Sequence, residues 1–250
     1  MQSLTLGLGV GLSCVSGSRY LLNYDFTKGF PAALTHTRAS NATYINSSGS
    51  VATASSNVPR ITHDKDGNAL GYLHEPQVTN HVLSSLDAFG TGTVKVGGAA
   101  VTDTGSVVSP SGATDAKEVT VSGANYLRHN VTLVAETAYV WSFWAKKGTA
   151  TTLKTSVYNI SGAAEISGIG LYDYTSQVST DEWTRIEIPF TTPAGCTSVG
   201  VYSTRGSSNG TFFIWGAQVE EGTAATSLIP TFGAEATRQA DAVADYVVAG

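Results

Sequence analysis

Short apolar stretches, each followed by turn residues, recur along much of the second half of the chain. Between residues 89 and 232 these stretches, rich in β-branched and aromatic residues, are Thr93–Val96, Ala116–Ser122, Ala138–Lys146, Thr152–Tyr158, Ile166–Tyr172, Trp183–Phe190, Ser198–Ser203 and Thr211–Val219. Gly, Asn, Asp, Ser or Pro separates nearly all of them. Such spacing is typical of strands in a sandwich. We therefore predict an all-β fold whose main part is a jelly-roll β-sandwich.

Composition supports this fold class and narrows the functions. Charged residues make up 13% of the 250 residues, so helical salt-bridge ladders have little material. Hydrophobic residues at 42% and a mean hydropathy of +0.02 are typical of a globular chain. No apolar stretch is long enough to insert into a membrane. The net charge of −5 argues against nucleic-acid partners.

Four regions differ in composition. Residues 1–18 form a Gly/Ser/Leu-rich extended arm, 19–88 a small β-rich region, 89–232 the sandwich and 233–250 a C-terminal tail. Extended terminal segments either fray or dock on a partner. If the arm docks, its alternating apolar residues are the candidates for contact: Leu4, Leu6, Leu8, Val10 and Leu12.

The 19–88 region reads as strands joined by turns. We predict strands at Tyr20–Tyr24, Ala42–Ile45, Arg60–His63 and Ala69–His74. The segment Asp64–Asn68 between the last two imitates the start of a calcium loop, but its glycine is misplaced for one, so we interpret it as a hairpin turn. Val78–Leu86 fits either a short helix or an irregular segment, and Ala234–Ala244 is similarly ambiguous.

Catalytic and metal-binding motifs are not evident. The five histidines lack metal-ligand spacing, and no nucleophile elbow or phosphate-binding loop occurs, so we predict no cofactor and no metal site. Cys14 and Cys196 stand far apart, and we interpret them as unpaired thiols rather than a disulfide. One enzymatic alternative is a polysaccharide-cleaving pair of carboxylates. The available acids are Asp173, Asp181, Glu187, Glu220 and Glu221.

Aromatic residues offer the better candidates for a binding site. In AYVWSFWAKK (138–147), alternation puts Tyr139, Trp141, Phe143 and Ala145 on one face, which we predict faces the core. Trp144 on the other face either is an exposed platform for a sugar or packs under the 19–88 region. The predicted glycan-binding residues are Trp144, Tyr172, Tyr174, Tyr202 and Arg205.

The strand GTFFIWGAQVEEG (210–222) is apolar on both faces, which predicts a central, buried position. Trp215 is then a core residue rather than a platform. Gly216 is where the alternation slips through a β-bulge.

Several blocks resemble the phage and prophage head-spike and tail-fibre family. They are Thr37–Tyr44 (TRASNATY), Asn57–Arg60 (NVPR), Gly71–Asn80 (GYLHEPQVTN), Ile214–Gly222 (IWGAQVEEG), Ala225–Thr231 (ATSLIPT) and Ala236–Asp241 (ATRQAD). The match runs in order over about residues 35 to 245. His74 and Leu228 depart from the usual residues of this pattern.

The resemblance implies a jelly-roll module like carbohydrate-binding modules, also similar to the head spikes of gene-transfer agents. It implies a non-catalytic virion-surface protein that binds host polysaccharide, is held to other virion proteins by its arm, and is a homo-oligomer (trimer or pentamer). A purely structural virion protein and a depolymerase are the alternatives. Within the blocks, we expect Pro59, Glu75, Pro76 and Asn80 to fix turns, and Arg38 or Arg60 to pair with Glu75.

Overall fold

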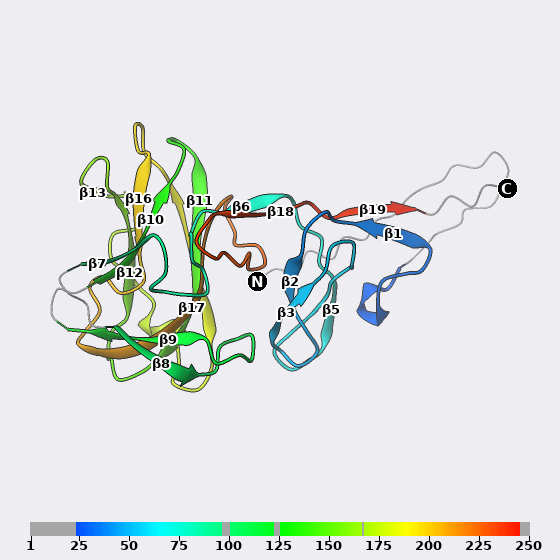
Figure 1. Ribbon diagram of the computed structural model, residues 1–250, viewed down its shortest axis with the longest axis horizontal. Helices are drawn as coiled ribbons and strands as arrows, with labels where there is room; N and C mark the ends of the chain where they lie inside the picture. Colours follow the sequence, from blue (N-terminus) through cyan, green and yellow to red (C-terminus); the bar gives the residue numbers. More distant parts are fainter. Residues whose placement is uncertain (1–23, 97–100, 123–125, 167, 246–250) are drawn as a thin grey trace. The chain divides into compact units, whose positions relative to one another are not determined.

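The computed structural model describes residues 24–96, 101–122, 126–166 and 168–245 (Figure 1). The chain divides into two compact units, which we describe separately. Unit 1 comprises Met1–Pro76 and Ala240–Gly250, and unit 2 comprises Gln77–Gln239. These boundaries differ from the predicted ones at 88/89 and 232/233. The predicted arm residues Leu4, Leu6, Leu8, Val10 and Leu12 lie outside the described residues.

Long-range strand pairs explain the shifted boundaries. In unit 2, β6 (Val78–Asn80) pairs antiparallel with β18 (Ala236–Arg238). In unit 1, β1 (Leu34–Thr37) pairs antiparallel with β19 (Ala242–Asp245). The C-terminal stretch Ala234–Ala244, whose structure the sequence left ambiguous, therefore contributes to one short strand in each unit. Such pairs join residues distant in the sequence, so local patterns do not reveal them.

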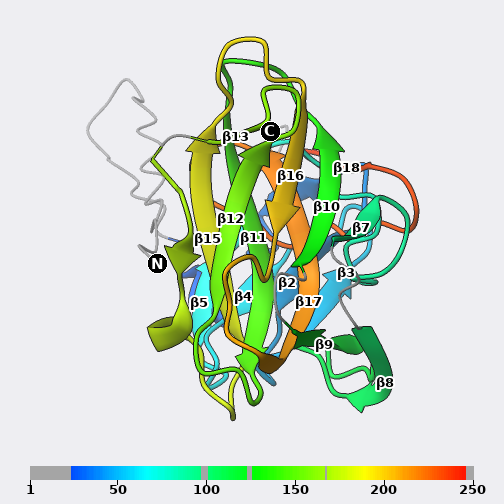
Figure 2. The same cartoon turned by 90° about the vertical axis from the view of Figure 1, so that its left-hand side faces the viewer.

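Unit 2 is the predicted jelly-roll β-sandwich, built from two antiparallel sheets (Figures 1 and 2). The six-stranded sheet contains, in spatial order, β13 (Ala164–Glu165), β12 (Lys154–Asn159), β16 (Ser198–Tyr202), β10 (Tyr126–Thr132) and β7 (Thr93–Val96), with β14 (Tyr172–Asp173) also paired to β12. The five-stranded sheet contains β15 (Thr184–Thr191), β11 (Ala138–Lys147), β17 (Gly210–Glu221), β9 (Ala116–Val121) and β8 (Val101–Val107). The all-β prediction is confirmed.

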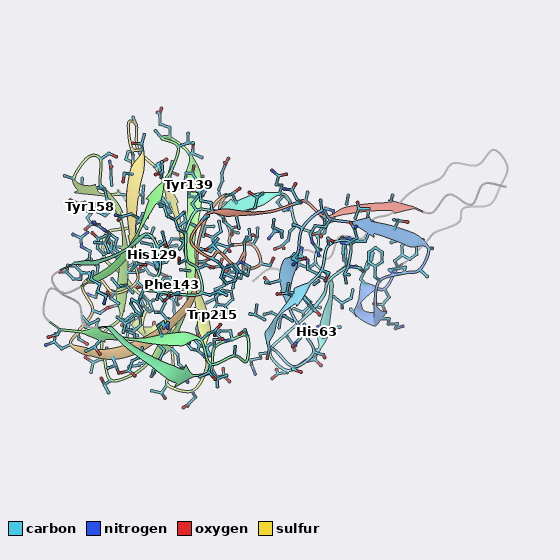
Figure 3. All side chains as sticks on the ribbon, in the orientation of Figure 1. His63, His129, Tyr139, Phe143, Tyr158 and Trp215 are labelled. Carbon is cyan, nitrogen blue, oxygen red and sulfur yellow. The ribbon has the colours of Figure 1, made fainter. Side chains whose placement is uncertain are left out.

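The core between the sheets follows the alternation read from the sequence. Tyr139, Trp141, Phe143 and Ala145 of β11 all belong to the buried apolar cluster, as predicted. His129 of β10 is also buried at 1% exposure. Figure 3 shows His129 and Phe143 between the two sheets. Burial of each large side chain stabilises the fold by roughly 1.5–3 kcal/mol.

Strand β17 is central, between β11 and β9, and it carries the predicted bulge. The register of β17 with β11 shifts between Ser142 and Trp144 of β11. Gly216 of β17 has a φ of +67°, a conformation that favours glycine. The bulge lets Ile214 and Ala217 both face the core. Trp215 is buried at 3%, as predicted, but it lies on the outer side of the sheet against Trp144 rather than in the main core.

Unit 1 consists of short hairpins. They are β2 (Ala42–Ile45) with β3 (Val51–Ala54) and β4 (Ile61–His63) with β5 (Ala69–Tyr72), and a 3-10 turn η1 (Phe26–Lys28) precedes β1. Asp64–Asn68 forms the predicted turn, in which the Asp64 carboxylate accepts hydrogen bonds from the backbone amides of Asp66 and Asn68. Within the described residues no group of acidic, His or Cys side chains is arranged to hold a metal ion.

A buried ionic network organises unit 1. The Asp241 carboxylate accepts hydrogen bonds from Arg38 Nη1 at 2.9 Å, Arg60 Nη2 at 2.5 Å and the Glu75 backbone amide at 2.9 Å. Arg60 is the partner of Glu75 among the two predicted alternatives, with an Nη1–Oε2 distance of 2.7 Å. Burial alone would raise the pKa of Asp241, but the hydrogen bond from Arg38 and the charge of Arg60 lower it overall. The ATRQAD block thus has a structural role.

Other expectations are corrected. Ile166–Tyr172 is not a continuous strand: β13 ends before it at Glu165, and β14 begins at its last residue, Tyr172. Val78–Leu86 forms no helix: it is β6 followed by bends, held by Asn80, whose side chain donates to Ala217 O and Ile229 O. Cys14 lies outside the described residues, and Cys196 is buried. Over the described ranges, the chain contains no helix with the length and apolarity needed to span a bilayer.

Candidate functional site

The outer face of the six-stranded sheet carries two aligned rows of side chains. In one row Tyr158 of β12 lies opposite Gly200 of β16, which lies opposite Asn130 of β10. In the next row Ser156, Tyr202 and Arg128 are aligned across the same strands. Figure 2 looks onto this sheet and shows β12, β16 and β10 side by side. We call the set the tyrosine–arginine face; it comprises Tyr126, Arg128, Asn130, Ser156, Tyr158, Glu165, Gly200, Tyr202 and Arg205.

Strand alternation fixes which side chains point outward. Leu127 and His129 of β10 face the core, so Arg128 and Asn130 face away from it. Val157 of β12 is likewise in the core, which places Tyr158 on the outer side. Figure 3 shows Tyr158 on the side of the sheet away from Phe143.

Arg205 stacks on two tyrosines of this face. Its guanidinium carbon lies 4.9 Å from the ring centroid of Tyr158 and 5.1 Å from that of Tyr202. The guanidinium also forms an ion pair with Glu165 of β13. Cation–π contacts of this kind contribute about 0.5–1 kcal/mol at exposed sites and hold the planar group over the rings. Three strands and the loop after β16 therefore fix one rigid array.

Arg128 lies on the other side of Tyr202. Its guanidinium carbon is 5.6 Å from the Tyr202 ring centroid, and its Nη1 donates to Tyr202 Oη at 3.0 Å. Gly200 makes room for this arginine, because a Cβ at position 200 would lie 2.6 Å from Arg128 Cδ. Tyr202, covered by the two arginines and by Tyr126 and Tyr158, is only 5% exposed, whereas Tyr158 is partly exposed.

Four buried polar atoms on this face make no hydrogen bond to a described residue: Arg128 Nε, Asn130 Oδ1, Ser156 Oγ and Arg205 Nη1, the last of which forms the ion pair with Glu165. An unsatisfied buried polar atom costs about 1–3 kcal/mol of stability. Arrangements that lower stability in this way concentrate at functional sites. These atoms make the face a candidate for ligand binding.

The outer face of the five-stranded sheet is covered instead. Trp144 packs against Trp215, with centroids 5.4 Å apart, and under the Arg185 guanidinium at 4.4 Å. Arg185 Nη1 donates to Thr226 O at 2.6 Å, and the Thr226 amide donates to Glu220. The segment 225–229 thus lies along this face. Trp144 is partly exposed, and the aromatic and cationic partners found for it, Trp215 and Arg185, belong to unit 2.

The predicted glycan-binding residues separate in the structure. Tyr202 and Arg205 come together on the tyrosine–arginine face, but Tyr174 is fully buried, donates to Ser203 O and is removed from the candidate set. Tyr172 is 38% exposed, but it pairs with Thr155, whose hydroxyl accepts from Trp141 on the core side, so Tyr172 points away from Tyr158. Trp144 belongs to the covered face.

The sequence reasoning missed most of this site. Tyr126, Arg128 and Asn130 lie in YLRHNVT (126–132), which was not predicted to be a strand because Arg, His and Asn obscure its alternation. Tyr158 was assigned to a strand without being singled out. The available signal was the alternation of Leu127, His129 and Val131 with polar partners. The array across β12, β16 and β10 depends on long-range register.

The acids considered for catalysis have other contacts. Glu220 is fully buried and accepts hydrogen bonds from the amide and hydroxyl of Thr226, and burial raises its pKa. Asp173 lies 4.0 Å from Lys154 Nζ.

A hollow of about 730 Å³ elsewhere in unit 2 is lined by Asp87, Asp115 and other polar residues beside the exposed Phe232.

Comparison with known proteins finds no sequence family. No family model and no curated protein sequence matches the chain. Among solved structures, the chain is similar to a xylan-binding domain of Paenibacillus barcinonensis Xyn10C (14% identity, 59% of this chain and 94% of that one, TM-score 0.41). It is also similar to a family 22 carbohydrate-binding module of Clostridium thermocellum Xyn10B (16% identity, 60% and 97%, TM-score 0.42).

A third similar structure is the enzymatically active domain of bacteriophage CBA120 tailspike protein 4, at 13% identity and a TM-score of 0.42. The match covers 57% of this chain but only 21% of the tailspike chain. These similarities are distant, so a site in this chain has to be argued from its own contacts.

Proposed function

We propose that the tyrosine–arginine face binds polysaccharide, without cleaving it, and that the chain is a surface component of a phage or phage-like particle that attaches to host glycans. The observation that carries the proposal is the Arg205 and Arg128 stack on Tyr158 and Tyr202, set on three adjacent strands. Side chains held on strands keep a fixed spacing before the ligand binds, which lowers the entropy cost of binding.

The chemistry of the face suits sugars. A pyranose ring presents a flat C–H surface that packs on an aromatic ring, while its hydroxyls need donors and acceptors. The face offers the partly exposed ring of Tyr158, guanidinium donors from two arginines and the Asn130 amide. The aligned rows run across three adjacent strands, as expected for a face that follows a polymer chain.

The virion role is supported by the sequence blocks that resemble spike and fibre proteins. Attachment through a single shallow face is weak, so several copies on one particle would supply avidity. We propose that residues 1–18 attach the chain to another virion protein. A trimer or pentamer would present several faces toward one cell surface.

The decisive test is binding to a panel of immobilised bacterial surface polysaccharides with Tyr158→Ala. We expect this variant to weaken binding by about tenfold or more, since it removes a stacking surface. Tyr172→Ala is the matched control, because Tyr172 is an exposed tyrosine on the other side of the same strand pair. Equal binding by wild type and Tyr158→Ala, or equal losses in both variants, would contradict the site.

Release of reducing ends from the same polysaccharides tests the non-catalytic part of the proposal. We expect none above a heat-denatured control. Cleavage would identify a depolymerase, and absence of binding to every polymer would favour a purely structural virion protein.

A further inference from the structure

The cations of the tyrosine–arginine face and its edge differ in their partners. Arg205 pairs with Glu165, and Lys154 lies 4.0 Å from Asp173. Arg128 has no carboxylate partner among the described residues: its contacts are a hydrogen bond to the neutral Tyr202 hydroxyl and a cation–π contact with the same ring. A positive charge is thus held on strand β10 without a counter-charge from any described carboxylate.

This arrangement is unfavourable for the protein alone. Partly buried charges are normally paired or hydrogen-bonded, because removal from water costs free energy. Arg128 Nε is buried and makes no hydrogen bond to any described residue. The whole chain carries a net charge of −5, so carboxylates are abundant, yet none in the described residues pairs with this guanidinium.

The position of Arg128 is fixed by its neighbours. Tyr202 Oη accepts from Nη1 on one side, and the stem lies over Gly200, where any larger residue would press on Cδ. On the next strand, Arg128 is aligned with Val94, which supplies no charge. A guanidinium held in one place by an aromatic hydroxyl and a glycine is prepared for a planar, charged acceptor.

We propose that the ligand of this face is an acidic polysaccharide and that Arg128 receives the carboxylate of an acidic sugar such as a uronic acid. The inference rests on the proposed function, since it names the substrate class of the same site. Arg205, whose charge is already paired with Glu165, contributes stacking rather than selection for charge. Arg128 is thus the residue that determines specificity.

The experiment compares pairs of polymers that differ only in the acid group. Polygalacturonate, hyaluronan, alginate and polysialic acid are each presented in native form and after reduction of their carboxylates to alcohols, together with neutral xylan and glucan. Affinity is measured for the full chain and for Arg128→Gln, Arg128→Lys and Lys147→Gln. Lys147 is the control, because it lies in β11 of the other sheet and its replacement removes the same charge.

We expect at least one acidic polymer to bind at least about tenfold more tightly than its reduced form. Arg128→Gln should abolish this preference, Arg128→Lys should retain part of it, and Lys147→Gln should leave it unchanged. Circular dichroism and thermal unfolding establish that the variants are folded. Higher salt should weaken binding of the acidic polymer more than that of its reduced form.

The outcomes separate this inference from the proposed function. Equal binding of native and reduced polymers, or binding of xylan or glucan alone, would overturn the acidic ligand and leave a glycan-binding face. A preference for acid that survives in Arg128→Gln would overturn the role of Arg128. Absence of binding to every polymer would overturn both.

Discussion

The two outer faces of the sandwich are built from similar side chains and yet differ in what lies over them. Each combines aromatic rings with an arginine: Trp144, Trp215 and Arg185 on the five-stranded sheet, Tyr158 and Tyr202 with two arginines on the six-stranded sheet. On the first, the segment 225–229 supplies hydrogen-bond partners to the sheet. On the second, the contacts of the rings and guanidinium groups within the described residues join residues of the sheet and its adjoining loop.

The two faces differ in what holds each arginine. Arg185 is anchored by Thr226 O and Ser142 Oγ while its plane covers Trp144, so its side chain closes a layer of structure. Arg128 and Arg205 stack in the same way, but among the described residues their partners belong to the sheet and its adjoining loop. A stacked arginine is therefore a candidate for ligand contact only where no segment of the described chain covers it.

Trp144→Ala should cause the largest loss of stability, because it removes the central ring of the covered face. Removing this partly exposed ring opens a gap beneath Arg185 and beside the buried Trp215, and we expect unit 2 to lose about 3 kcal/mol of unfolding free energy. Glycan binding should persist under conditions where the variant is folded. Denaturant unfolding followed by tryptophan fluorescence measures the first effect. Loss of glycan binding in a fully folded variant would show that the covered face also contacts the ligand.

Low pH should lower the unfolding free energy of unit 2 through His129 of β10, which lies beneath the tyrosine–arginine face. Burial lowers the pKa of His129 from 6.5 to about 4, partly opposed by the charge of Asp87. The folded state thus keeps His129 neutral, while the unfolded chain becomes protonated below pH 6.5. The stability that depends on the neutral ring is complete above pH 6.5 and declines toward pH 4, by about 3 kcal/mol at most.

Unfolding free energies at pH 7.5 and pH 4.5 measure this loss, and the titration of the His129 ring by NMR identifies its source. A His129 ring that titrates near pH 6.5 in the folded protein would contradict the assignment. The loss of unfolding free energy caused by Trp144→Ala should not change with pH in this way. This distinguishes the effect at the five-stranded sheet from the effect of His129 in the six-stranded sheet.

Gly200→Ala should have the smallest effect on stability. It tests whether the position of Arg128 on the tyrosine–arginine face matters for binding. The new Cβ would lie 2.6 Å from Arg128 Cδ and 3.3 Å from Tyr202 Cε2, so the arginine stem must leave its present position, and we expect a loss of about 1 kcal/mol. Displacement of the guanidinium should weaken binding of an acidic polymer severalfold. Calorimetric binding with parallel thermal unfolding measures both quantities. Unchanged binding would mean that the position of Arg128 is not critical.

The sequence alone determined the fold class and the interior of the sandwich. Turn residues between β-branched and aromatic stretches predicted the strands, and alternation in 138–147 identified Tyr139, Trp141, Phe143 and Ala145 as core residues. The bulge at Gly216 was also foreseen, because a glycine interrupted the alternation. These features depend on local conformation and on the two-residue period of a strand, which neighbouring residues specify.

Only the tertiary structure decided which surfaces are covered and which side chains meet. Trp144 and Tyr158 both face outward by alternation, but the covering segment 225–229 lies about eighty residues further along the chain from the first of them. The alignment of Tyr158, Gly200 and Asn130 depends on the register of three strands that are not consecutive in sequence. Register and covering are set by packing of the whole core, so local patterns could name the aromatic residues without locating the candidate binding face.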